Sequence, residues 1–143
     1  MTRAELLAYI RRQRLGVIAT MSSDGRPESA VVGVAVTDEL EVVFDTLGTS
    51  RKAKNLRRDG RASLVIGWDD EQTVQYEGIA DEPTGAELAR LKKAYFATFS
   101  DGPGRESWPG ITYFRVRPTW IRYSDFRSAP PLIREFAGAP LEG

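Results

Sequence analysis

The chain of 143 residues contains no cysteine and no histidine. Their absence excludes thiolate chemistry, disulfides, iron–sulfur ligation, the usual zinc sites and nucleophiles activated by an imidazole. The chain therefore lacks the side chains on which most hydrolase mechanisms depend. If the protein is an enzyme, we expect an organic cofactor to supply the reactive atoms while the protein supplies position and electrostatics.

Net charge and long apolar runs are also absent. The 20 lysines and arginines balance the 20 aspartates and glutamates, so attraction to nucleic acid should be weak and we expect no nucleic-acid partner. The first residues, MTRAELLAYIRRQR, scatter charges through a short apolar stripe. Because this segment fits neither a signal peptide nor a membrane span, we expect a cytoplasmic protein with no membrane partner.

What is present is a series of short strand patterns with a few helical ones. Strand patterns cover residues 16–21, 29–36, 40–45, 62–68, 73–80, 111–117 and 119–123, and helical patterns cover residues 2–14 and the segments that follow Ser50 and Thr84. This order favours a mainly β fold, a small antiparallel barrel with peripheral helices, over a doubly wound sheet. The run 30–36 is apolar on both faces, which predicts a strand buried inside a closed sheet.

The end of the chain has a different composition. Pro130, Pro131 and Pro140 follow Asp125 within a short stretch. Prolines in this density predict irregular backbone. We therefore expect one domain over residues 1–125 and an irregular tail over residues 126–143.

The segment 44–56, FDTLGTSRKAKNL, passes from a strand through a turn into a cationic helix. Thr49 or Ser50 can cap this helix, which carries Arg51, Lys52 and Lys54. The free amides at a helix start, a hydroxyl and two cationic side chains together suit a phosphate group. The alternative is a basic helix that faces solvent.

The chain resembles the pyridoxamine-phosphate oxidase superfamily of flavin-binding split barrels over residues 5–125. The resemblance rests on the order of four segments: VVFDTLGTSRKAKNL, RASLVIGW, VQYEGIADE and RVRPTWIRY. It implies a six- or seven-stranded antiparallel split β-barrel that forms a homodimer and binds FMN in two clefts between the subunits.

The resemblance also implies roles for individual residues. The FMN phosphate would be held by Ser50, Arg51 and Lys52, with Lys54 either adding charge or facing solvent. The remaining contacts would come from Asp45 and Thr46 (phosphate or ribityl chain), from the main chain of Val31, Val32 and Gly33 (flavin edge) and from Gln75.

Several positions depart from the oxidase pattern. Ala30 stands where the oxidase has a phosphate-binding arginine, and Phe99 stands where an arginine grips the substrate phosphate, although Tyr95 matches a substrate-contacting tyrosine. The Arg-Leu-His run of the oxidase is missing after Ser124. We therefore do not expect pyridoxamine-phosphate oxidase activity.

The resemblance favours an FMN-binding oxidoreductase that acts on an unidentified small molecule by hydride transfer, with a nicotinamide as a candidate donor. Two alternatives remain open at this point: a deazaflavin-dependent reductase, and a flavin-binding sensor or carrier without turnover. We expect no metal site, because the consecutive carboxylates of residues 69–71 belong to a solvated turn.

Overall fold

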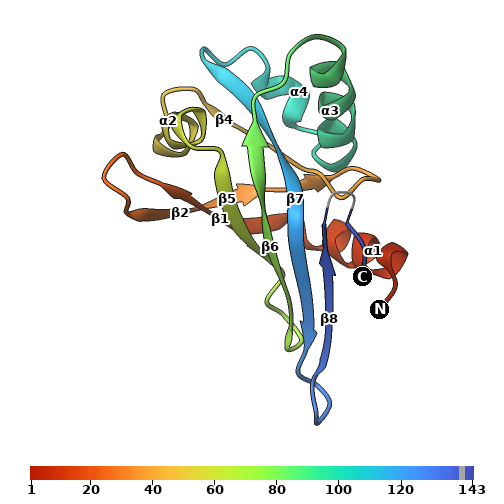
Figure 1. The fold of residues 1–143 in the computed structure, drawn as a ribbon. Helices are drawn as coiled ribbons and strands as arrows, with labels where there is room; N and C mark the ends of the chain where they lie inside the picture. The colour runs from red at the N-terminus through yellow and green to blue at the C-terminus, as the bar shows by residue number, and fades with distance from the viewer. Residues whose placement is uncertain (139–140) are drawn as a thin grey trace.

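In a computed structural model, which describes residues 1–138 and 141–143, eight strands form one antiparallel sheet that curls into a half-barrel (Figure 1). The strands are β1 (Leu15–Met21), β2 (Pro27–Gly33), β3 (Ala35–Val36), β4 (Val42–Leu47), β5 (Arg61–Ile66), β6 (Gln72–Asp81), β7 (Ile111–Asp125) and β8 (Leu132–Ala137). Their order is β2-β1-β5-β6-β7-β4-β3, with β8 paired to β7 outside this path. The predicted mainly β split barrel with six or seven antiparallel strands is confirmed, and β8 is an addition to it.

The core forms because alternate residues of the strands face inward. On β6, Val74 and Tyr76 are buried while Gln75 and Glu77 are exposed. The Tyr76 hydroxyl donates to the main-chain oxygens of Leu40 (2.8 Å) and Val116 (2.9 Å), so this buried polar group is satisfied.

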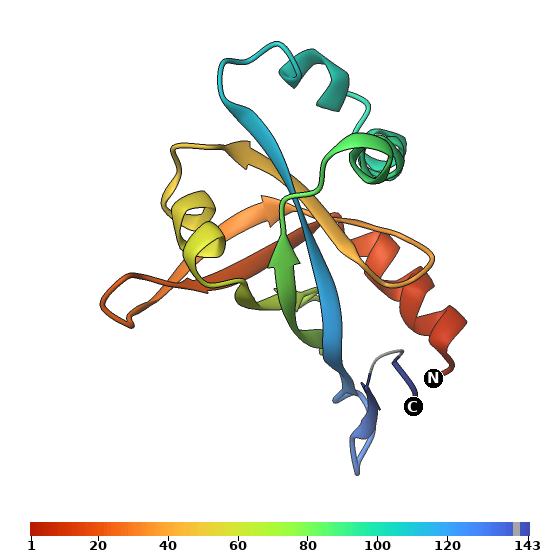
Figure 2. The same ribbon diagram turned by 45° about the horizontal axis from the view of Figure 1, so that its top comes forward.

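Four helices lie around the sheet, and the first three match the helical patterns of the sequence (Figure 2). They are α1 (Arg3–Gln13), α2 (Arg51–Arg58), α3 (Gly85–Thr98) and α4 (Gly102–Arg105). Thr2 and Glu5 form a capping box at α1, whereas the Thr84 side chain makes no capping hydrogen bond at α3. Within the described residues, the helices are too short or too polar to cross a bilayer.

The two strand patterns on either side of Pro118, over residues 111–117 and 119–123, form one continuous strand, β7. It runs for 15 residues and pairs with β4 through its first half, with β8 through its second half and with β6 through most of its length. The register shifts between Glu77 and Gly78, which lie opposite Trp120 and Pro118, so Thr119 is the extra residue of a bulge.

The expectation of an irregular tail is wrong for residues 132–137. These residues form β8, which pairs with residues 120–125 of β7 and buries Phe136. The segment LIREFA contains enough apolar residues to form a strand, and Pro130 and Pro131 precede it rather than interrupt it. Pro140 lies outside the described residues.

The bulge generates a prediction about Gly78. A Cβ at this position would lie 2.2 Å from the Arg117 main-chain oxygen, which belongs to the paired strand and cannot move aside cheaply. Gly78→Ala should therefore lower the free energy of unfolding by about 2 kcal/mol or more, measured by urea denaturation. Gly104→Ala is the control, because no atom lies within 4 Å of its added Cβ. Equal stability of the two variants would contradict this account of the bulge.

Candidate functional site

The first turn of α2 is held against β4 by two hydroxyl groups. Ser50 is the N-cap of α2, and its Oγ accepts a hydrogen bond from the Ala53 amide (3.2 Å) and another from the Thr46 hydroxyl (3.0 Å). Thr46 is itself buried. These contacts position the two residues that follow, Arg51 and Lys52.

Arg51 and Lys52 line one pocket between α2 and the β1–β2 hairpin, which lie side by side in both ribbon views (Figures 1 and 2). The pocket has a volume of about 210 Å³. Its lining consists of Thr20, Glu28, Ser29, Ala30, Arg51 and Lys52. Two cationic side chains beside a capped helix start are a suitable donor set for a phosphate group.

The sequence analysis did not single out Glu28, which lies in the same pocket. Its carboxylate pairs with the Arg51 guanidinium and accepts a hydrogen bond from Asn55 Nδ2 (2.8 Å), whose other acceptor is the Thr20 hydroxyl (3.0 Å). The sequence did contain a signal for Glu28. It stands two positions before Ala30 on the same strand, and residues two positions apart on a strand lie on the same face of the sheet.

Asp45 lies away from this pocket, although its neighbour Thr46 is hydrogen-bonded to Ser50. Adjacent residues of a strand face opposite sides, and the Asp45 carboxylate accepts hydrogen bonds from Arg105 Nε (2.8 Å) and the Tyr95 hydroxyl (3.0 Å). Burial, followed by the nearby Asp45 carboxylate, raises the pKa of Tyr95 far above its usual value. The hydrogen bond that Arg105 donates to the Asp45 carboxylate raises the pKa of the Arg105 guanidinium. The structure therefore joins Asp45 to α3 and α4 and not to Arg51 and Lys52.

The apolar residues of β2 differ in their exposure. The expectation of a strand buried on both faces is wrong in the single chain, because β2 is an edge strand and the Val31 side chain is 63% exposed. Val32 faces the core and is buried. Gly33 is covered by Phe99, whose ring would lie 2.8 Å from an added Cβ. The contact of the main chain of these three residues with a flavin stays a prediction.

Gln75 and Lys54 are both outside the pocket. The strand registers place Gln75 opposite Val65, Val65 opposite Val17, and Val17 opposite Val31, so these four residues form a row across the outer face of the sheet. Three strand spacings separate Val31 from Gln75, a distance of about 14 Å. Lys54 is exposed on α2.

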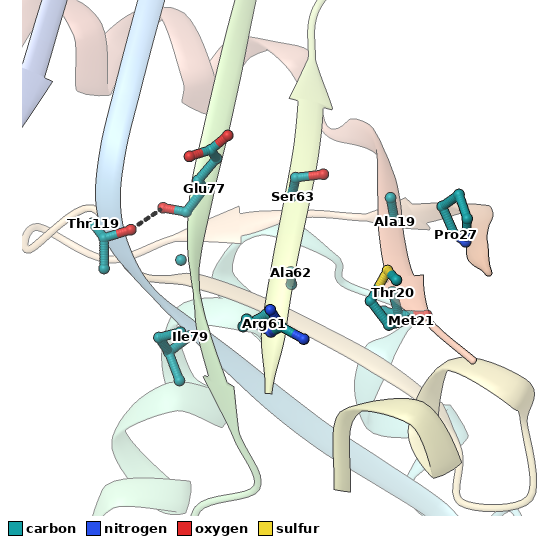
Figure 3. Close-up of a pocket in the computed structure, with 11 residues that line it drawn as sticks. Ala19, Thr20, Met21, Pro27, Arg61, Ala62, Ser63, Glu77, Ile79 and Thr119 are labelled. Carbon is teal, nitrogen blue, oxygen red and sulfur yellow. Dashed lines mark hydrogen bonds between the residues drawn. The ribbon is translucent and has the colours of Figure 1, made fainter. Parts of the chain in front are cut away.

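Another pocket, of about 460 Å³, lies on the outer face of the sheet (Figure 3). Side chains of β1, β5 and β6 line it, including Ala19, Met21, Ser63 and Ile79. It is mainly apolar, although Arg61 and Glu77 also reach it. Among the residues that the structure describes, no group of three or more acidic side chains could hold a metal ion.

Comparison with known proteins relates this fold to one family. The family model of pyridoxamine 5'-phosphate oxidase matches residues 2–125. A pyridoxine/pyridoxamine 5'-phosphate oxidase of Rubrobacter xylanophilus is 31% identical over 126 residues, which are 87% of this chain and 55% of that protein. The chain thus spans about half the length of the curated relatives that it matches.

Solved structures show the same fold at lower identity. A haem-binding protein of Mycobacterium smegmatis is 20% identical with a TM-score of 0.81, over 98% of this chain and 60% of that one. A pyridoxamine 5'-phosphate oxidase-related, FMN-binding protein of Nostoc punctiforme is 16% identical with a TM-score of 0.69, over 94% and 87% of the two chains.

The contacts of Asp45 generate a prediction about stability. Arg105→Gln should lower the free energy of unfolding by about 1–3 kcal/mol, because it leaves the largely buried Asp45 carboxylate, 13% exposed, without its cation. Arg26→Gln is the matched control, since the Arg26–Asp24 pair is exposed on both sides and should contribute little. Urea denaturation of both variants measures the difference, and equal values would contradict a structural role for this ion pair.

Proposed function

The chain belongs to the pyridoxamine 5'-phosphate oxidase family, and on this basis we propose that it is an FMN-binding oxidoreductase that transfers hydride to or from a small molecule. The observation that carries the proposal is the pocket of Arg51 and Lys52 beside the capped start of α2. In this proposal the two cations bind the FMN phosphate, and the hydroxyls of Ser50 and Thr46 hold the helix start in place.

The residues present fit such a cofactor in three respects. The pocket offers cationic donors for a phosphate, its volume suits that group rather than a whole flavin, and the main chain of the edge strand β2 continues from it past Ala30. When bound, FMN would supply the hydride chemistry, so the protein needs no nucleophile of its own. This agrees with a chain that lacks cysteine and histidine.

Other members of the fold bind haem, but the donor set here favours a flavin. Histidine and cysteine are common axial ligands of haem iron, and the chain contains neither. The substrate is expected to differ from that of the oxidases, because Ala30 and Phe99 replace two arginines of the oxidase pattern. Reduction of the bound flavin by NADH or NADPH, and reoxidation by an acceptor, separates an oxidoreductase from a carrier.

A homodimer is part of the same proposal. The outer face of the sheet exposes Val31, Val65 and Ile79 (63%, 40% and 50%) around the apolar pocket of Figure 3. A second copy on this face would cover these side chains. It would also bring its own Gln75 toward the β2 edge that the first chain's Gln75 cannot reach.

The phosphate assignment predicts the effect of removing both cations. Arg51→Ala combined with Lys52→Ala should weaken FMN binding by more than about tenfold, because a hydrogen bond to a charged group contributes about 1.5–3 kcal/mol. Lys54→Ala, on the exposed face of the same helix, should have little effect. Titration followed by flavin fluorescence measures both, and a double variant within about threefold of wild type would contradict the assignment.

The dimer generates its own prediction. Val65→Lys places a charge in the middle of the outer apolar row, so it should shift the protein from dimer to monomer in light scattering coupled to size exclusion. Leu47→Lys is the control, because Leu47 is equally exposed (43%) at the end of β4, away from this row. A Val65 variant that remains dimeric would argue against this interface.

A further inference from the structure

Arg14, the residue that follows α1, has an unfavourable backbone conformation. Its φ of 62° lies in the region that glycine adopts readily and that other residues rarely adopt. The Arg14 main-chain oxygen accepts a hydrogen bond from the Val34 amide (2.8 Å), which fixes this conformation against the residue after β2. Glycine would accept the same hydrogen bond without the strain. A role of Arg14 therefore belongs to its side chain and not to its backbone.

The Arg14 side chain is a cation without a carboxylate partner. It is exposed, and its guanidinium carbon lies 5.0 Å from the centre of the Phe99 ring. Arg11, on the same helix, pairs with Asp38, whereas no carboxylate among residues 1–138 and 141–143 lies within 4 Å of the Arg14 guanidinium nitrogens. The five N–H donors of a guanidinium lie in its plane, so one that lies over a ring can still donate to an anion.

Arg14 lies at the opposite end of β2 from the phosphate pocket. Ala30 lines that pocket, and Gly33 at the end of β2 is paired with Leu15, the residue after Arg14. Phe99 covers Gly33. Three residues of a strand span about 10 Å, which is comparable to the length of a phosphorylated five-carbon arm. An FMN bound by its phosphate in that pocket can therefore bring its ring to the end of β2, beside Phe99 and Arg14.

The surroundings of Arg14 define a class of ligand. Leu15 is 46% exposed and, together with the Phe99 ring, offers apolar surface next to the guanidinium. The paired donors of a guanidinium match the two oxygens of a carboxylate. One unpaired guanidinium also balances a single negative charge, whereas a phosphate monoester carries about −1.5 to −2 at pH 7. A small carboxylic acid with an apolar body fits this surface.

We propose that Arg14 binds a carboxylate group of the substrate and selects for small apolar carboxylic acids. Phe99 stands where the oxidase pattern has a substrate-binding arginine, and Arg14 places a guanidinium over that ring from a different helix. The inference rests on the proposed function, because a flavin ring at the end of β2 is what makes this surface a substrate site.

The test is the binding of benzoate, and of its uncharged analogue benzamide, to the FMN-loaded protein in isothermal titration calorimetry. Benzoate should bind the wild type more tightly than benzamide. Arg14→Gln should weaken benzoate binding by about tenfold, the loss expected for a charged hydrogen bond. It should leave the affinities for benzamide and FMN within about threefold. Arg14→Lys, which keeps the charge but not the paired donors, should lose less than Arg14→Gln.

Two further variants separate binding from structure. Arg12→Gln removes another exposed arginine of α1, whose guanidinium lies 5.7 Å from the centre of the Tyr9 ring, and should leave benzoate affinity within about twofold. Arg14→Gly accepts the positive φ, so it should retain or raise the melting temperature while it weakens benzoate binding as much as Arg14→Gln does. A lower melting temperature with equal losses for benzoate and benzamide would show a structural role and overturn the inference.

The outcomes distinguish this inference from the proposed function. If the wild type does not bind FMN, the proposed function and this inference are both wrong. If FMN binds, this inference alone is overturned when benzoate binds no better than benzamide, when Arg14→Gln leaves benzoate affinity unchanged, or when Arg12→Gln causes an equal loss. Inorganic phosphate that binds the FMN-loaded protein more tightly than benzoate, and is lost in Arg14→Gln, would overturn the assignment to carboxylates.

Discussion

The hydrogen bonds that Ser50 accepts from Thr46 and Ala53 are the contacts on which the candidate site depends. They join the end of β4 to the first turn of α2, so the direction of the helix is set by the sheet. At the other end of α2, Arg57 donates to the Gly48 oxygen (2.8 Å) and pairs with Glu82. Because both ends of α2 are held, Arg51 and Lys52 face the β1–β2 hairpin together. The fold therefore sets the charge of the pocket.

Much of this arrangement could be predicted from the sequence because local signals carry it. The N-cap at Ser50, the alternation along β6 and the Asp24-Gly25 turn each depend on a few neighbouring residues, and the structure contains all of them. Asp45 shows what the sequence could not supply: the resemblance groups it with Thr46 as a contact of the phosphate or ribityl chain, whereas strand alternation places its side chain on the other side, against Arg105 from a distant helix. Glu28 was missed for a related reason, since its partners Arg51 and Asn55 are distant in sequence.

The surface of the half-barrel near α3 is aromatic, whereas the pocket beside α2 is lined by charged side chains. Phe99 covers Gly33, and its ring lies 4.9 Å from the Tyr95 ring at an interplanar angle of 35°. The Arg14 guanidinium lies 5.0 Å from the centre of the Phe99 ring. Where the oxidase pattern places an arginine for a substrate phosphate, this chain has an aromatic ring already in contact with its own residues.

Strand β7 links three other strands of the sheet through its hydrogen bonds. Because it is hydrogen-bonded to β4, β6 and β8, it can separate from the sheet only if three ladders break together. Its amides should therefore exchange with solvent only through global opening, while the two-residue strand β3 at the end of the sheet opens far more readily. The half-barrel would then behave as a single cooperative unit, and small rearrangements during ligand entry would be confined to its edges.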